Sequence, residues 1–79
     1  NLYPNPAKTI ANLVISGVIT NEINIEISDI LGRPVIINKY NTVIGKSRIN
    51  LDLTNFEKGI YFIKVIADNN SQIFKLIHE

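Results

Sequence analysis

The stretch FEKGIYFIKVIA, residues 56–67, decides the fold. From Ile60 to Ala67 the apolar side chains occupy both faces of a period-two pattern, which predicts a central β-strand covered on both sides. Just before it, Gly59 and Tyr61 predict a tyrosine corner, in which the hydroxyl bonds back to the preceding loop and the glycine permits a tight chain path. Such a corner is typical of immunoglobulin-like sandwiches.

The same two-residue period continues on both sides of this stretch. Residues 22–29 and 47–53 place isoleucine or leucine at alternate positions, which predicts strands with one apolar face, and residues 34–37 are apolar on both faces. Turn residues recur roughly every 8–12 positions. The predicted strands are residues 1–3, 11–16, 22–29, 34–40, 47–53, 60–67 and 72–78.

Seven short antiparallel strands indicate an all-β, immunoglobulin-like two-sheet sandwich, with a small open barrel as the alternative. The last two strands form a C-terminal hairpin through a turn at 68–71. Isoleucine, valine and threonine make up 25 of the 79 residues, which favours strands over helices. We expect one domain over residues 1–79, excised from a larger secreted parent, because the chain starts at Asn1 and shows no signal peptide.

Composition excludes most chemistry. A net charge of +1 argues against nucleic-acid binding, and the absence of cysteine excludes disulfides, thiolate catalysis and cysteine-ligated metals. The carboxylates are dispersed, and the single histidine, His78, is expected to be solvent-exposed near a frayed end. No stretch is long enough for a membrane helix. We therefore expect no catalytic, cofactor or metal site, no membrane insertion, and a monomeric protein that is not an enzyme.

Three short motifs have ordinary structural interpretations. Pro4 and Pro6 end a short edge strand and direct the chain to the next one. The segment DILGRPV, residues 29–35, predicts a hairpin loop with Gly32 at positive φ, and an exposed Asp29–Arg33 pair there contributes only ~0–1 kcal/mol. The segment NNS, residues 69–71, matches the glycosylation pattern, but its composition favours a tight turn.

In order along the chain, YPNP (3–6), ISDILGRPV (27–35), INL (49–51), GIYFIKV (59–65) and FKLI (74–77) form a series. The series resembles the type A C-terminal sorting domain of the type IX secretion system of Bacteroidota. It covers nearly the whole chain, from Tyr3 to the end. The sandwich fold known for that family agrees with the strand count.

The resemblance implies export. Such domains direct a covalently fused N-terminal cargo from the periplasm to the outer-membrane type IX translocon, so the product is secreted or held at the cell surface. A sortase-like cysteine peptidase generally removes the domain by cutting in the linker before it, outside residues 3–79. No cofactor is implied.

Carried over by position, the family's motifs fall on nine residues: Pro4, Asn5, Pro6, Gly32, Arg33, Gly59, Tyr61, Lys64 and Lys75. The chain departs from the family at its end, because His78 and Glu79 stand where further basic residues are common. We hypothesise that the last strand, 72–78, is the recognised element and pairs with a receptor strand. Lys75 also has a simpler interpretation, as a charge that prevents unwanted pairing.

The alternative function is an interaction module: an immunoglobulin-like or fibronectin-like spacer, or a carbohydrate-binding unit of a secreted enzyme. A carbohydrate-binding surface predicts an exposed aromatic platform. Tyr3, Tyr40 and Phe74 are the residues available to form it.

Overall fold

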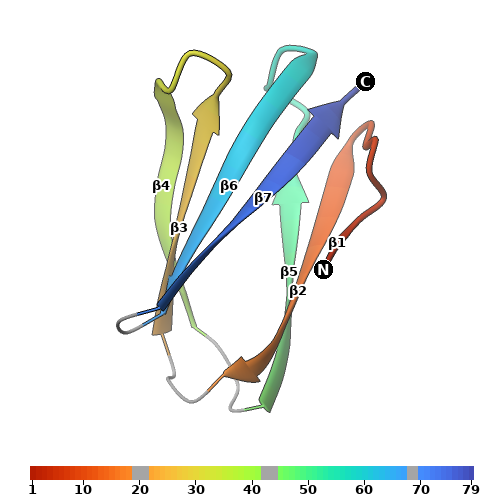
Figure 1. Cartoon of the computed structure of the whole chain (residues 1–79). Coiled ribbons are helices and arrows are strands. Elements are labelled where there is room, and N and C mark those ends of the chain that lie inside the picture. The colour runs from red at the N-terminus through yellow and green to blue at the C-terminus, as the bar shows by residue number, and fades with distance from the viewer. Residues whose placement is uncertain (19–21, 42–44, 68–69) are drawn as a thin grey trace.

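A computed structural model of the chain describes residues 1–18, 22–41, 45–67 and 70–79. It contains two antiparallel sheets that face each other (Figure 1). The first sheet has the order β1-β2-β5 and comprises β1 (Leu2–Tyr3), β2 (Ile10–Val18) and β5 (Gly45–Asp52). The second has the order β4-β3-β6-β7 and comprises β3 (Glu22–Asp29), β4 (Pro34–Asn41), β6 (Gly59–Ala67) and β7 (Asn70–His78).

The predicted all-β sandwich is confirmed, and the strand bounds differ from the predicted ones by at most two residues at either end. At the C-terminal hairpin, Asn70 and Ser71 already belong to β7, where they pair with Ala67 and Ile66, so the connection is shorter than the predicted turn. Residues 68–69, and with them the asparagine that begins the glycosylation pattern, lie outside the described residues. Within the described residues, no helix is long and apolar enough to cross a membrane.

The core lies between the two sheets, and the two-residue period decides which side chains enter it. In β6, for example, Tyr61, Ile63 and Val65 are buried, whereas Phe62 and Lys64 between them are exposed. The buried apolar residues are Ala7, Ala11, Leu13, Ile23, Ile25, Ile27, Ile49, Leu51, Leu53, Tyr61, Ile63, Val65 and Leu76.

The outer face of the second sheet is open to solvent. β6 is central, as predicted, with β3 on one side and β7 on the other, but the expectation that both of its faces are covered is wrong. The apolar segment 34–37 likewise belongs to an edge strand, β4, and Ile37 is 62% exposed. The reason is the two-layer architecture: no third layer packs on the outer face, so apolar residues there remain at the surface.

The chain changes sheets at the proline-rich start. Leu2 and Tyr3 pair with β2 in the first sheet, whereas Ala7 forms a parallel bridge with His78 at the end of β7 in the second. The Tyr3–Pro4 and Asn5–Pro6 peptide bonds between these pairings are cis. The predicted role of the prolines in directing the chain onward is confirmed, and the crossing brings the start of the chain to its end.

Replacing Ile63 by alanine should lower the free energy of unfolding by about 2–5 kcal/mol, because the side chain is fully buried and leaves a cavity. The matched control is Ile73→Ala on the neighbouring strand, where the side chain is 65% exposed and the change should stay within about 0.5 kcal/mol. Urea unfolding followed by circular dichroism measures both. Equal losses in the two variants would contradict the assignment of the core.

Candidate functional site

The sequence motifs gather at one end of the sandwich. Residues 5–7, 29–33, 56–61 and 76–79 all lie at the upper end in Figure 1. We call this region the motif end. It contains the crossing segment, the β3–β4 hairpin, the loop before β6 and the end of β7.

Residues 5–7, which we call the clasp, pair with the edge of β7. The Asn5 side-chain Nδ2 donates to the Lys75 carbonyl oxygen at 2.7 Å, and the Ile77 N–H donates to Asn5 Oδ1 at 2.9 Å. The Ala7 N–H then donates to the Ile77 carbonyl, and the Glu79 N–H donates to the Ala7 carbonyl, both at 2.8 Å. The amide of Asn5 therefore satisfies β7 as a backbone peptide of a neighbouring strand would.

Prolines on either side of Asn5 suit this arrangement. Pro4 and Pro6 have no backbone N–H, so the turn of the chain from one sheet to the other leaves no donor unpaired at those two positions. The side chain between them supplies both the donor and the acceptor that the edge of β7 requires.

His78 is buried, at 8% exposure, and the expectation of an exposed histidine is wrong. Its ring Nδ1 lies 3.1 Å from the Ala7 carbonyl oxygen, and its Nε2 lies 3.2 Å from the Phe56 carbonyl oxygen. The strand continues to His78, so alternation turns this side chain inward together with Leu76, beneath the clasp. The histidine thereby joins the clasp to the loop that precedes β6.

The predicted tyrosine corner is present in that loop. The Tyr61 hydroxyl donates a hydrogen bond to the Glu57 carbonyl oxygen, and the Phe56 ring packs against the Tyr61 ring at 5.2 Å between centroids. Gly59 has a φ of +149°, which side-chain-bearing residues rarely adopt. Burial raises the pKa of the Tyr61 hydroxyl above its usual value, and the charges of Glu57 and Asp29 raise it further, so the phenol retains its proton as a donor.

The β3–β4 hairpin is organised by the carboxylate of Asp29. Its Oδ1 accepts hydrogen bonds from the Leu31 and Arg33 backbone N–H groups, both at 2.9 Å, and its Oδ2 lies 2.8 Å from Arg33 Nε. Gly32 takes the predicted positive φ, +84°. The hydrogen bond from the Arg33 backbone N–H is the largest influence on the pKa of Asp29 and lowers it. Desolvation comes second and opposes this effect, and the Arg33 side chain and the Leu31 N–H lower the pKa further.

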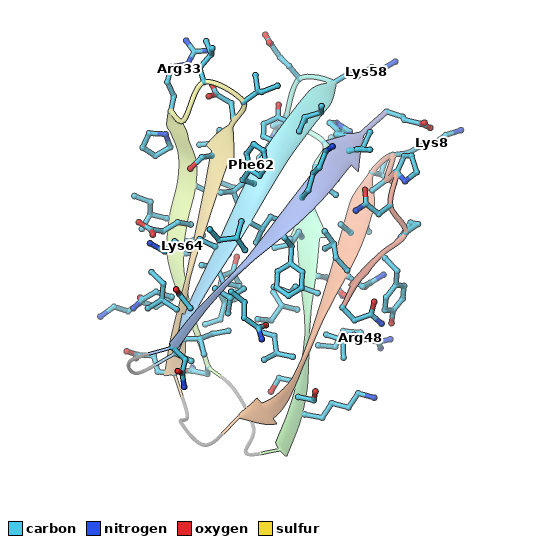
Figure 2. All side chains as sticks on the ribbon, in the orientation of Figure 1. Lys8, Arg33, Arg48, Lys58, Phe62 and Lys64 are labelled. Carbon is cyan, nitrogen blue, oxygen red and sulfur yellow. The ribbon has the colours of Figure 1, made fainter. Side chains whose placement is uncertain are left out.

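The tip of this hairpin is apolar and exposed. Ile30 is 63% exposed and Leu31 is 74% exposed. A shallow hollow of about 370 Å³ separates the tip from the loop of the tyrosine corner, and Phe56 and Lys58 contribute to its wall. Figure 2 shows Arg33, Lys58 and Lys8 at the same end of the molecule.

The structure brings most of the nine sequence-predicted residues to or beside the motif end. These are Pro4, Asn5, Pro6, Gly32, Arg33, Gly59, Tyr61 and Lys75. Lys64 lies elsewhere, on the outer face in the middle of β6, where it is opposite Ile73 and Glu26 (Figure 2). Sequence reasoning missed the buried role of His78, although alternation from Leu76 pointed inward.

The family of the protein is shown by a match that covers the whole chain. A sequence model of the family described as secretion system C-terminal sorting domain matches residues 1–79. The chain belongs to this family. No curated protein and no solved structure matches the chain significantly.

As a type IX sorting domain, the chain marks proteins for export through the outer membrane, to the cell surface or into the medium. The family consists of secretion signals and is not a catalytic one. Among the described residues of this sorting domain, no three histidine or carboxylate side chains are grouped to hold a metal ion.

Replacing Asn5 by leucine keeps the approximate size of the side chain but removes both of its hydrogen bonds to β7. We expect a loss of about 1–2 kcal/mol in the free energy of unfolding, because the β7 groups at this exposed edge must exchange their partner for water. Urea unfolding measures the loss, with Asn38→Leu at the exposed edge of β4 as the control. A clasp that contributes nothing would leave the two variants equally stable.

Acid should weaken the β3–β4 hairpin through Asp29. Its pKa is lowered in the folded state, so its ionised form adds stability at neutral pH, and that stability is lost as the pH falls below its usual value of 3.8. Asp29→Asn should therefore flatten the fall in the urea midpoint between about pH 5 and about pH 2. Asp29→Asn/Asp52→Asn should flatten it further, since hydrogen bonds from Thr54 also lower the pKa of Asp52. A wild-type acid slope in Asp29→Asn would refute this assignment.

Proposed function

We propose that this sorting domain directs a covalently fused N-terminal cargo through the type IX translocon, and that the translocon recognises the folded motif end. Family membership supports the sorting role. The proposal that the translocon recognises the folded motif end rests on one observation: segments up to 72 positions apart in sequence meet in a single hydrogen-bonded array.

The array is continuous across the motif end. The clasp bonds to the end of β7, and His78 of β7 faces carbonyl oxygens of both the clasp and the loop at Phe56. The next residue of that loop, Glu57, accepts the Tyr61 hydroxyl bond. A linear C-terminal peptide contains the end of β7 alone, so recognition of this arrangement requires the folded domain.

The surface beside the array, at the same end of the molecule, suits a protein partner. Ile30 and Leu31 stand exposed at the hairpin tip, where they add nothing to the core, and the basic side chains Arg33, Lys58 and Lys8 lie at the same end (Figure 2). Exposed apolar residues rimmed by polar ones are typical of protein interaction sites. We assign the tip as the main contact of the motif end.

We place the cleavage site at which the domain is removed on the N-terminal side of β1. A peptidase acts on an extended segment that is free of other pairing, whereas the Asn1 amino group donates to the Val14 carbonyl at 3.0 Å and the Val14 N–H donates to the Asn1 carbonyl at 2.7 Å. The segment that a sortase-like cysteine peptidase would cut therefore precedes the paired residues.

The alternative of a carbohydrate-binding module gains no support from the aromatic side chains. Tyr40 and Phe74 are half-buried and pack against the core. Tyr3 is exposed but belongs to the other sheet. These three side chains form no common platform, so we retain the sorting function alone.

Export of a reporter fused to the domain tests the proposal in a bacterium that has a type IX system. Leu31→Ser should lower the exported fraction several-fold, because burial of a leucine side chain at an interface is worth ~1.5–3 kcal/mol. The control is Ile37→Ser, a similar change at a similarly exposed residue on the outer face of β4. Immunoblots of medium, cell surface and periplasm give the fractions, and thermal unfolding verifies the fold of each variant. Equal export of Leu31→Ser and wild type would overturn recognition at the hairpin tip.

A further inference from the structure

The free edge of β7 is divided into two halves. The clasp pairs with the part from Lys75 to Glu79. Ahead of the clasp the chain lies in the other sheet, because Leu2 and Tyr3 pair with β2. The stretch 70–74 therefore forms an open edge, with no strand beside it among the described residues.

Alternation shows which backbone groups point out of this open edge. The Lys75 carbonyl and the Ile77 N–H bond to the clasp, so the odd-numbered residues of β7 face away from β6. The β6–β7 register is regular throughout, so Ser71 and Ile73 face the same way. Their N–H and C=O groups are available to a further strand.

Two other edge strands carry residues that discourage pairing. β4 begins with Pro34 and contains Lys39, and β5 contains Lys46 and Arg48. Prolines and charges of this kind are how proteins protect exposed edges. The stretch Asn-Ser-Gln-Ile-Phe at 70–74 has neither a proline nor a charge.

A groove of about 470 Å³ lies beside the open edge, between β7 and β2. Its lining comes from Asn1 and from Val14, Ile15 and Ser16 of β2 on one side, and from Gln72, Ile73 and Phe74 of β7 on the other. Every second side chain of a strand added along 70–74 would point toward this groove. The groove therefore accommodates small apolar or polar side chains.

Two lysines are exposed on the outer face of this sheet. Lys75 belongs to β7 itself and lies next to the position of an added strand, whereas Lys64 lies one strand further in, on β6, opposite Ile73. Neither ammonium group forms an ion pair within the described residues. Acidic residues are therefore favoured at the outward-facing positions of an added strand.

We infer that an extended segment of a protein of the secretion machinery adds to this sheet as a further strand along residues 70–74. It hydrogen-bonds the backbone of Ser71 and Ile73, and it directs acidic side chains toward Lys75 on the outer face. This inference rests on the proposed sorting function and adds a second contact, separate from the motif end. The hypothesis that the last strand is the recognised element is thereby restricted to the first half of that strand.

A pair of proline variants tests the inference. Ile73→Pro removes an N–H that faces the open edge and leaves the β6 ladder intact. Its control is Ile37→Pro, at an equivalent position on the opposite edge of the same sheet, and the two side chains are 65% and 62% exposed. In the reporter export assay, Ile73→Pro should lose most of its export, whereas Ile37→Pro should match wild type.

A matched pair of glutamate variants provides a second test in case a proline variant fails to fold. Ile73→Glu places a carboxylate against the incoming acidic segment and should reduce export several-fold, whereas Ile37→Glu should not. Lack of export by the wild-type fusion would overturn the sorting function itself. Normal export by wild type and by both Ile73 variants would overturn strand addition alone.

Hydrogen exchange locates the added strand directly. When purified translocon is mixed with the domain, exchange of the Ser71 and Ile73 amides should slow at least several-fold, and exchange of the Ile37 amide should not change. Unchanged exchange at Ser71 and Ile73 in the complex would overturn the inference. Protection of the same amides in the isolated domain as its concentration rises would identify a second copy as the occupant, and would equally overturn the assignment to a translocon segment.

Discussion

Two hydrogen bonds from the Asn5 side-chain amide hold the beginning of the chain on the edge of its last strand. An asparagine amide presents N–H donors and a carbonyl acceptor with the chemistry of a peptide group, so it can replace backbone pairing at a point where prolines interrupt it. This contact lies where the chain crosses from one sheet to the other. The crossing also covers His78 and divides the edge of β7 into a closed half and an open half.

The two-layer architecture separates stability from recognition. Inward-facing side chains such as Ile25, Ile63 and Leu76 form the core, and the sequence contains no cysteine that could add a disulfide to it. The outer face of the second sheet and the loop tips do not contribute to this core. Exposed apolar residues such as Leu31 and Ile73 can therefore serve contacts with other proteins without a role in folding.

Local patterns in the sequence were sufficient for much of the fold. The period of two identified the strands and the inward face of β6, and the Gly59–Tyr61 pair identified the tyrosine corner, because these features depend on neighbours within a few residues. The contact between Asn5 and Ile77 spans 72 positions, and no local pattern specifies it. Alternation from Leu76 placed His78 on the inner face, but the clasp residue that lies against its ring, Ala7, is 71 positions away, and the sequence alone did not specify that contact. Lys64 was grouped with the motifs by resemblance, but its place in the middle of a strand keeps it away from them.

The parallel alignment of the clasp with β7 has a mechanical consequence. The bonds of Asn5 and Ala7 to β7 lie across the direction of both strands. When the chain at Asn1 is pulled one way and β7 is held, the tension runs along the strands. These bonds are then loaded in shear and resist together, whereas bonds in a hairpin pulled from its open end break one after another. The clasp therefore resists a pull along the start of the chain better than a hairpin of the same number of bonds would.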